Sequence, residues 1–157
     1  MSRIGTTVRQ KLSAENRRFR TAVREPMIFV IEDSPIWAEA MEQLCDYLDV
    51  RLTRITPDCD LRAALRDQRP MAVLAEMEGA AQDGCYVLQV IGAHDPDLPV
   101  MVRTGRDEAM IGAGQAVQQI WRLSAVQFVE AVPTAAEMMD FLCRAGQRGG
   151  CLGLVPS

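Results

Sequence analysis

Two neighbouring carboxylates, Glu32 and Asp33, directly follow an apolar run from Met27 to Ile31. An apolar run without a polar break predicts a central strand of a parallel sheet, covered on both faces. In open α/β sheets, ligands bind at the carboxyl ends of such strands. Two adjacent carboxylates repel each other unless a cation or a proton relieves them, so the pair indicates a divalent-metal or phosphoryl site. The other interpretation is structural, with one solvated acid at the strand end and one at a helix start.

The residues after the acidic pair are expected to begin a helix. Ser34 is expected to cap it, and Pro35 to lie at or near its first position, where the missing N–H costs nothing. Trp37 then either covers the acidic site or packs at the helix start.

The elements that must position the acidic pair alternate between strand and helix along the chain. The expected strands are 27–31, 50–56, 71–75, 99–105 with its turn, and 126–129. The expected helices are 35–48, 61–69, 85–93, 107–123 and 134–145. Five β-α units joined by short turns predict a doubly wound, five-stranded parallel sheet of the flavodoxin-like kind, with helices on both faces.

The residues at the expected strand ends resemble those of the receiver domain of bacterial two-component response regulators, over 27–145. In that family an acidic pair ends the first strand, a phospho-accepting Asp the third, a Ser or Thr the fourth and a Lys, usually before Pro, the fifth. Glu32 and Asp33 match the acidic pair, and Thr104 matches the hydroxyl. Gly84 matches a loop glycine eight residues after the acceptor, which places Glu76 at the acceptor position.

Two departures from the family pattern bear on the chemistry. Ala131 and Val132 stand before Pro133, where the resemblance implies the lysine. A Glu carboxylate lies about 1.5 Å farther out than that of Asp, and a displacement near 1 Å can cost roughly 100-fold in rate. Loss of a preorganised charge costs on the order of 100- to 1,000-fold. Ordinary phosphotransfer is therefore expected to be absent or negligible.

Glu32, Asp33 and Glu76 are nevertheless expected to converge on one spot, with no cation opposite them. Either Mg²⁺ binds there weakly, or one carboxyl holds a proton at a raised pKa. Phe128 matches the family's switch aromatic, although an aromatic in a buried strand also fits a core role. His94 is expected in a surface turn.

Composition and charge divide the chain of 157 residues into one domain and two short extensions. Residues 1–26 hold seven basic and two acidic residues, a net charge of +5, which leaves −9 on the remainder of a chain whose total is −4. Within them, 6–24 is expected to form a helix that packs on its own domain or pairs with another chain. Its apolar stripe consists of Val8, Leu12, Phe19 and Val23. Residues 146–157 are expected to form a glycine-rich, partly mobile tail.

The same composition excludes several classes of protein. No apolar run is long enough for a membrane span or signal peptide, so a cytoplasmic location is expected. The five scattered cysteines and the single histidine predict free thiols and no zinc site. Nucleic-acid binding by the basic segment is not expected, because no aromatic interleaving accompanies the arginines.

The sequence therefore indicates a stand-alone, atypical receiver-like signalling domain rather than an enzyme. It would act by protein–protein interaction, without phosphorylation, on another signalling protein. A homodimer could use the N-terminal helix, or the face formed by the fourth expected helix, fifth strand and fifth expected helix. The alternative is a Mg²⁺-dependent phospho-accepting regulator that uses a carboxylate of the acidic pocket.

Overall fold

Five parallel strands form one sheet in the computed structural model, which describes residues 24–79 and 83–151. The elements are β1 (Met27–Ile31), α2 (Ile36–Leu48), β2 (Arg51–Arg54), α3 (Leu61–Gln68), β3 (Ala72–Glu76), α4 (Gly84–His94), β4 (Val100–Arg103), α5 (Glu108–Trp121), β5 (Val126–Val129) and α6 (Ala135–Gly149). The strand order is β2-β1-β3-β4-β5, and every pair is parallel. The predicted doubly wound sheet is confirmed, whereas the predicted helix 6–24 lies outside the described residues.

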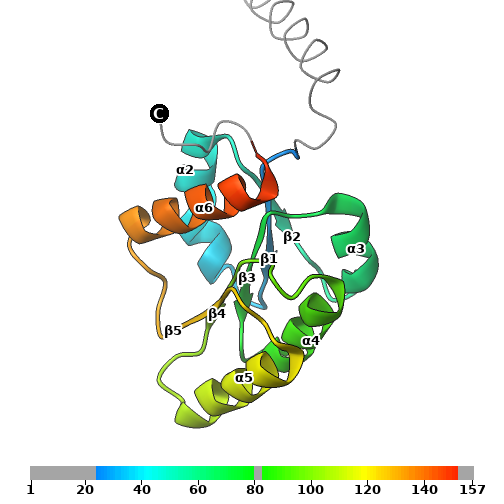
Figure 1. Ribbon diagram of the computed structural model, residues 1–157. Helices are drawn as coiled ribbons and strands as arrows, with labels where there is room; N and C mark the ends of the chain where they lie inside the picture. Colours follow the sequence, from blue (N-terminus) through cyan, green and yellow to red (C-terminus); the bar gives the residue numbers. More distant parts are fainter. Residues whose placement is uncertain (1–23, 80–82, 152–157) are drawn as a thin grey trace, which may run out of the picture.

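Helices cover both faces of the sheet, with α2 and α6 on one side and α3, α4 and α5 on the other (Figure 1). Each face has its own hydrophobic cluster, and the central strands contribute alternate residues to the two. Phe29 and Val73 pack toward α3, α4 and α5, while Ile28 and Leu74 pack toward α2 and α6. All five residues of β1 are buried, as its unbroken apolar run predicts.

Short polar side chains fix where most of the helices begin. Asp60, Asp83, Asp107 and Thr134 each accept a backbone N–H of the helix that follows them. These caps satisfy amide groups that have no partner within the helix. They also determine the path of the loops that leave the carboxyl ends of the strands.

The last helix is longer than the sequence pattern indicates. Helix α6 continues to Gly149, Gly150 ends it with a left-handed φ of 70°, and Cys151 is buried at 1% exposure. The expected boundary at residue 145 is therefore wrong, because Ala145 and Gly146 are buried helix residues. A Cβ on Gly149 would lie 3.5 Å from the Met71 Cβ, an ordinary van der Waals contact.

Other expectations concern single residues. All five cysteines are free thiols, as predicted. His94 is exposed, but it is the last residue of α4 rather than part of a turn. No helix in the described ranges is long and apolar enough to cross a membrane.

Candidate functional site

The carboxyl ends of β1, β3 and β4 border a cleft of about 310 Å³. Its lining residues are Asp33, Ser34, Ile36, Glu76, Glu78, Arg103, Thr104 and Gly105. A hollow of about 20 Å³ on the β2 side is lined in part by Glu32, Asp33 and Glu76. The structure thus brings the three acidic residues to one edge of the sheet, together with Arg103 and Thr104.

Glu32 is the helix cap at this edge. Its Oε1 accepts the Trp37 N–H at 2.7 Å, and its Oε2 accepts the Ala38 N–H at 2.9 Å. The expectation that Ser34 caps α2 is wrong, because Pro35 takes the N-cap position and no side chain at that position accepts a helix N–H. The longer Glu32 side chain reaches the exposed amides from the strand end instead. Both of its carboxylate oxygens are therefore engaged by the first turn of α2.

Trp37 belongs to the core rather than to a cover over the site. Its side chain is fully buried, and its Nε1 donates to the Ala75 carbonyl at 3.0 Å. This bond ties the start of α2 to β3, one residue before Glu76. The indole therefore fixes the positions of two of the strand ends that border the cleft.

Glu76 is the last residue of β3, and Arg103, the last residue of β4, is its register partner. The Arg103 Nε donates to the Glu76 Oε1 at 2.8 Å, with side-chain exposures of 27% for Arg103 and 11% for Glu76. The expectation that the carboxylates face no cation is wrong. Sequence reasoning missed Arg103, although a charged residue that ends an otherwise apolar strand beside Thr104 was a usable signal.

Burial of Glu76 and the positive charge of Arg103 shift the pKa of the Glu76 carboxyl group in opposite directions. Partial burial raises the pKa of its carboxyl group above the ordinary value, and the hydrogen bond and positive charge of Arg103 lower it. The negative charges of Glu32 and Asp33 add smaller upward contributions to that pKa. The net direction is upward, so Arg103 offsets the cost of burying this carboxylate only in part.

Thr104 and Gly84 hold the loops around the cleft. The Thr104 Oγ1 donates to the Gly105 carbonyl at 2.9 Å, and its amide donates to the Val129 carbonyl at 2.8 Å. Gly84 packs so closely on β3 that a Cβ there would lie 2.6 Å from the Met77 Cα. The glycine at position 84 therefore has a packing reason.

The sequence was compared with protein families and with curated proteins. No protein-family model matches the sequence. One curated relative is the "Probable transcriptional regulatory protein TcrX" of Mycobacterium tuberculosis, 29% identical over 89 residues. That match covers 56% of this chain and 38% of the relative, so the chain spans less than half of that protein.

Solved receiver domains superpose on most of the chain. The beryllofluoride-activated NtrC receiver domain has a TM-score of 0.56 at 20% identity, covering 80% of this chain and 98% of its own. A response-regulator receiver domain protein from Clostridium thermocellum has a TM-score of 0.61 at 18% identity, covering 78% of this chain and 95% of its own. The chain has a receiver fold.

A third receiver domain, from a Pseudomonas aeruginosa sensor histidine kinase, was crystallised with magnesium coordinated in its active-site cleft. It has a TM-score of 0.62 at 17% identity and covers 78% of this chain and 98% of its own. In the present receiver fold, Glu32 is engaged by amides and Glu76 by Arg103. Within the described ranges, no group of three or more His, Cys, Asp or Glu side chains is arranged to hold a metal ion. Two of the three carboxylates that would hold the ion are thus already engaged within the protein.

The fifth strand of this receiver fold supplies no cation to the cleft. Ala131 is exposed, and Val132 is partly buried against the cluster under α2 and α6. Phe128, the switch-aromatic candidate, is partly buried against the opposite cluster. Its ring lies against α5, where a Cβ on Gly114 would be 2.5 Å from the Phe128 Cε1.

Proposed function

We propose that this chain is an atypical receiver-like signalling domain that acts by binding another protein and does not accept a phosphoryl group. The observation that carries this proposal is the ion pair between Glu76 and Arg103 at the acceptor position. It rests also on the receiver fold and on the resemblance at the other strand ends. No catalytic role is assigned to any residue.

Phosphoryl transfer to a carboxylate needs an oxygen that can attack in line and cations that neutralise the charge on the phosphoryl oxygens. Glu76 Oε1 is committed to Arg103 Nε, and a raised pKa makes its carboxylate harder to ionise. Both carboxylate oxygens of Glu32 accept hydrogen bonds from backbone N–H groups of α2. Neither residue is then well placed to attack a phosphoryl group or to recruit a divalent ion, so any Mg²⁺ binding is weak.

The partner-binding surface is proposed to be the face formed by α5, β5 and α6. Two large apolar side chains near the end of α5 are exposed, Ile120 at 75% and Trp121 at 39%, although Trp121 also lies against Gly92 of α4. Another signalling protein, or a second copy of this chain, would cover them. Pairing through the basic segment 6–24, which the sequence predicts to be a helix, is the other proposed way to form a homodimer, and the proposed location is cytoplasmic.

The second candidate function is a Mg²⁺-dependent phospho-acceptor. It is favoured by the magnesium-bound receiver relative and by Asp33, which lines the same cleft as Glu76 and Thr104. In that case an acidic side chain of the cleft would form the acyl phosphate.

Acetyl phosphate with MgCl₂, followed by intact-mass measurement, separates the two candidates. We expect no new species, while a receiver domain with an acceptor aspartate, treated in parallel, gains about 80 Da. An acid-stable, base-labile species of that mass in this protein would refute the first candidate. The variants Asp33→Asn and Glu76→Gln would then identify the modified carboxylate.

Calorimetric titration with Mg²⁺ tests the metal separately, in wild type, Asp33→Asn and Arg103→Ala. We expect little or no heat in the first two proteins and measurable binding in Arg103→Ala, because that change releases the Glu76 carboxylate. Strong heat in wild type that Asp33→Asn abolishes would instead support the magnesium-dependent candidate.

The proposed face is tested by affinity capture from the native host with wild type, Ile120→Arg and a matched control. The control is Tyr47→Arg, since Tyr47 is 79% exposed on α2, away from the proposed face. A specific partner should be lost with Ile120→Arg and retained with Tyr47→Arg. Equal capture of the partner by both variants would show that it binds at a surface other than the face formed by α5, β5 and α6.

A further inference from the structure

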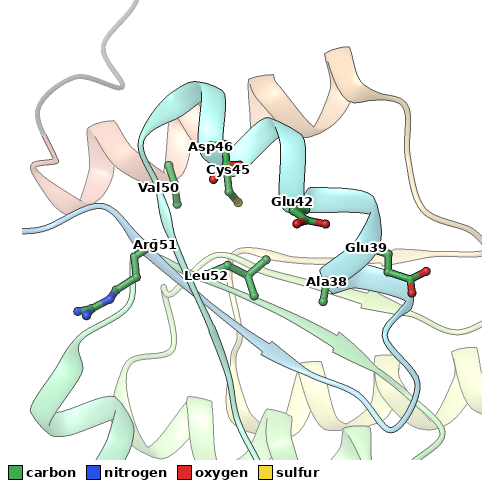
Figure 2. A pocket seen from close by; sticks show the side chains of 8 residues that line it. All are labelled: Ala38, Glu39, Glu42, Cys45, Asp46, Val50, Arg51 and Leu52. Carbon is green, nitrogen blue, oxygen red and sulfur yellow. The ribbon is translucent and has the colours of Figure 1, made fainter.

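A groove of about 440 Å³ lies between α2 and the edge strand β2, outside the site described above. Figure 2 shows that its lining side chains come from the α2 helix, from Val50 in the connection that follows it, and from the start of β2. The lining consists of Ala38, Glu39, Glu42, Cys45, Asp46, Val50, Arg51 and Leu52. Nothing in the proposed signalling function uses this surface.

The groove combines an apolar floor with an acidic rim. Val50 and Cys45 are buried in the cluster under α2, and Leu52 is partly buried against it. Burial raises the pKa of the Cys45 thiol to about 11, with a smaller contribution from Asp46, so the thiol is neutral near pH 7 and adds to the apolar character.

Three carboxylates form the rim on the helix side. Glu39, Glu42 and Asp46 recur at spacings of three and four, which places them along one side of α2. All three are exposed, and within residues 24–79 and 83–151 none of them makes an ion pair. A basic, amphipathic occupant would match both the floor and the rim.

The first residues that the structure describes lie at one end of this groove. The Glu25 carboxylate lies 3.7 Å from the Arg51 guanidinium, and the Arg51 N–H donates to the Pro26 carbonyl at 2.9 Å. Arg51 itself lines the groove. The basic segment 6–24 therefore leads into the end of the groove that Arg51 lines, with a high effective concentration for binding in the same molecule.

The sequence of that segment has the complementary pattern. As a helix, 6–24 would align its apolar stripe on one side, with Arg9 and Arg20 along one flank and Lys11 and Arg18 along the other. From Val8 to Val23 the stripe would be about 22 Å long, and α2 with its 13 residues is about 20 Å long. The apolar stripe and α2 therefore have similar lengths.

We propose that the basic segment 6–24 docks as a helix into the α2–β2 groove of its own chain, with its apolar stripe on the floor and one basic flank on the acidic rim. Docking covers the exposed edge of β2, which would otherwise offer unpaired backbone groups to other chains. The inference goes beyond the proposed function, because it leaves the face of α5, β5 and α6 open to a partner.

Hydrogen–deuterium exchange of the full chain tests the docking. We expect at least about tenfold slower exchange in 6–24 than in an unstructured peptide of the same sequence, because docking keeps the helical amides closed. Reversal of the rim in Glu39→Lys/Glu42→Lys/Asp46→Lys should remove this protection. The matched control Asp58→Lys/Asp67→Lys/Asp140→Lys changes the net charge equally, at exposed carboxylates away from the groove, and should keep the protection.

A second charge reversal, in segment 6–24, identifies which basic flank of the segment contacts the rim. Restored protection would also show that the rim-reversed chain is still folded. In the rim-reversed chain, either Arg9→Glu/Arg20→Glu or Lys11→Glu/Arg18→Glu should restore the slow exchange. Protection should also fall when salt is raised from about 50 mM to about 500 mM, because the rim is exposed.

Three outcomes would overturn the inference. They are fast exchange of 6–24 in wild type, equal protection in the rim-reversed and control chains, and protection that grows with protein concentration alongside a dimer in light scattering. The last result would assign the segment to a second copy, and binding that requires added anionic vesicles would assign it to a membrane surface. The phosphorylation test is independent of all these results.

Discussion

Glu76 and Arg103 end adjacent parallel strands as register partners, and their side chains meet at 2.8 Å. By the resemblance to receiver domains, this pair is proposed to stand at the phospho-acceptor position. It places the positive charge on β4, whereas the resemblance implied a lysine after β5. The charge of Glu76 is thus neutralised within the protein, by a partner whose position is set by backbone pairing.

Removal of the cation should cost stability. Arg103→Ala leaves Glu76 partly buried without its ion pair, so we expect a loss of about 1–3 kcal/mol in the free energy of unfolding, below the figure for fully buried pairs because both groups keep some solvent. The control is Arg106→Ala, which breaks a 3.8 Å pair between side chains that are 92% and 64% exposed. It should change stability by less than about 0.5 kcal/mol. Equal losses in urea denaturation would contradict the role given to Arg103.

The raised pKa of Glu76 predicts a pH dependence of unusual sign for a carboxylate. Between the ordinary value of 4.5 and the raised value, the folded protein binds more protons than the unfolded chain. The contribution of Glu76 to stability should therefore fall as pH rises through that window and recover below it. Urea denaturation of wild type and Glu76→Gln from about pH 4 to about pH 7 measures this difference. In the Arg103→Ala background, the decrease in the stability contribution of Glu76 should extend to higher pH. A stability difference between wild type and Glu76→Gln that grows with pH would contradict the raised pKa of Glu76.

The fold was accessible from the sequence because its signals are local. The apolar run of β1, the apolar residues of β3 and the bounds of β5 follow from composition and breakers, and their alternation with helices implies the parallel sheet. Helix α6 was underestimated because glycine lowers helix propensity, whereas here Gly146 is a buried helix residue and Gly149 lies beside Met71. Tertiary packing overrides the local preference at those positions.

The side-chain partners at the site were not accessible in the same way. The pairing of Glu76 with Arg103 depends on the register between β3 and β4, which no local pattern specifies. The role of Glu32 depends on α2 beginning one residue later than expected, with Pro35 at the cap position. Each result needs three-dimensional geometry, although the residue types were visible in the sequence.

Glu32 should be a larger contributor to stability than the serine that the sequence favoured. Glu32→Ala removes two charge-assisted hydrogen bonds to the first turn of α2, so we expect a loss of about 1–2 kcal/mol. Glu32→Gln keeps one acceptor oxygen and should lose roughly half as much. Ser34→Ala is the control and should stay within about 0.5 kcal/mol of wild type, because Pro35 rather than Ser34 takes the N-cap position. A larger loss in Ser34→Ala than in Glu32→Ala, by urea denaturation, would reverse the assignment.

Two glycines of one helix should respond oppositely to the same substitution. A Cβ on Gly114 would lie 2.5 Å from the Phe128 ring, whereas a Cβ on Gly112 meets nothing within 4 Å. Gly112→Ala should therefore stabilise the protein by about 0.5–1 kcal/mol through helix propensity. Gly114→Ala should destabilise it by about 1–3 kcal/mol through overpacking, and Phe128→Leu in that background should recover part of the loss. Stabilisation by both alanines in thermal or urea unfolding would mean that the ring leaves α5 readily, which is the behaviour expected of a switch aromatic rather than of a packed core residue.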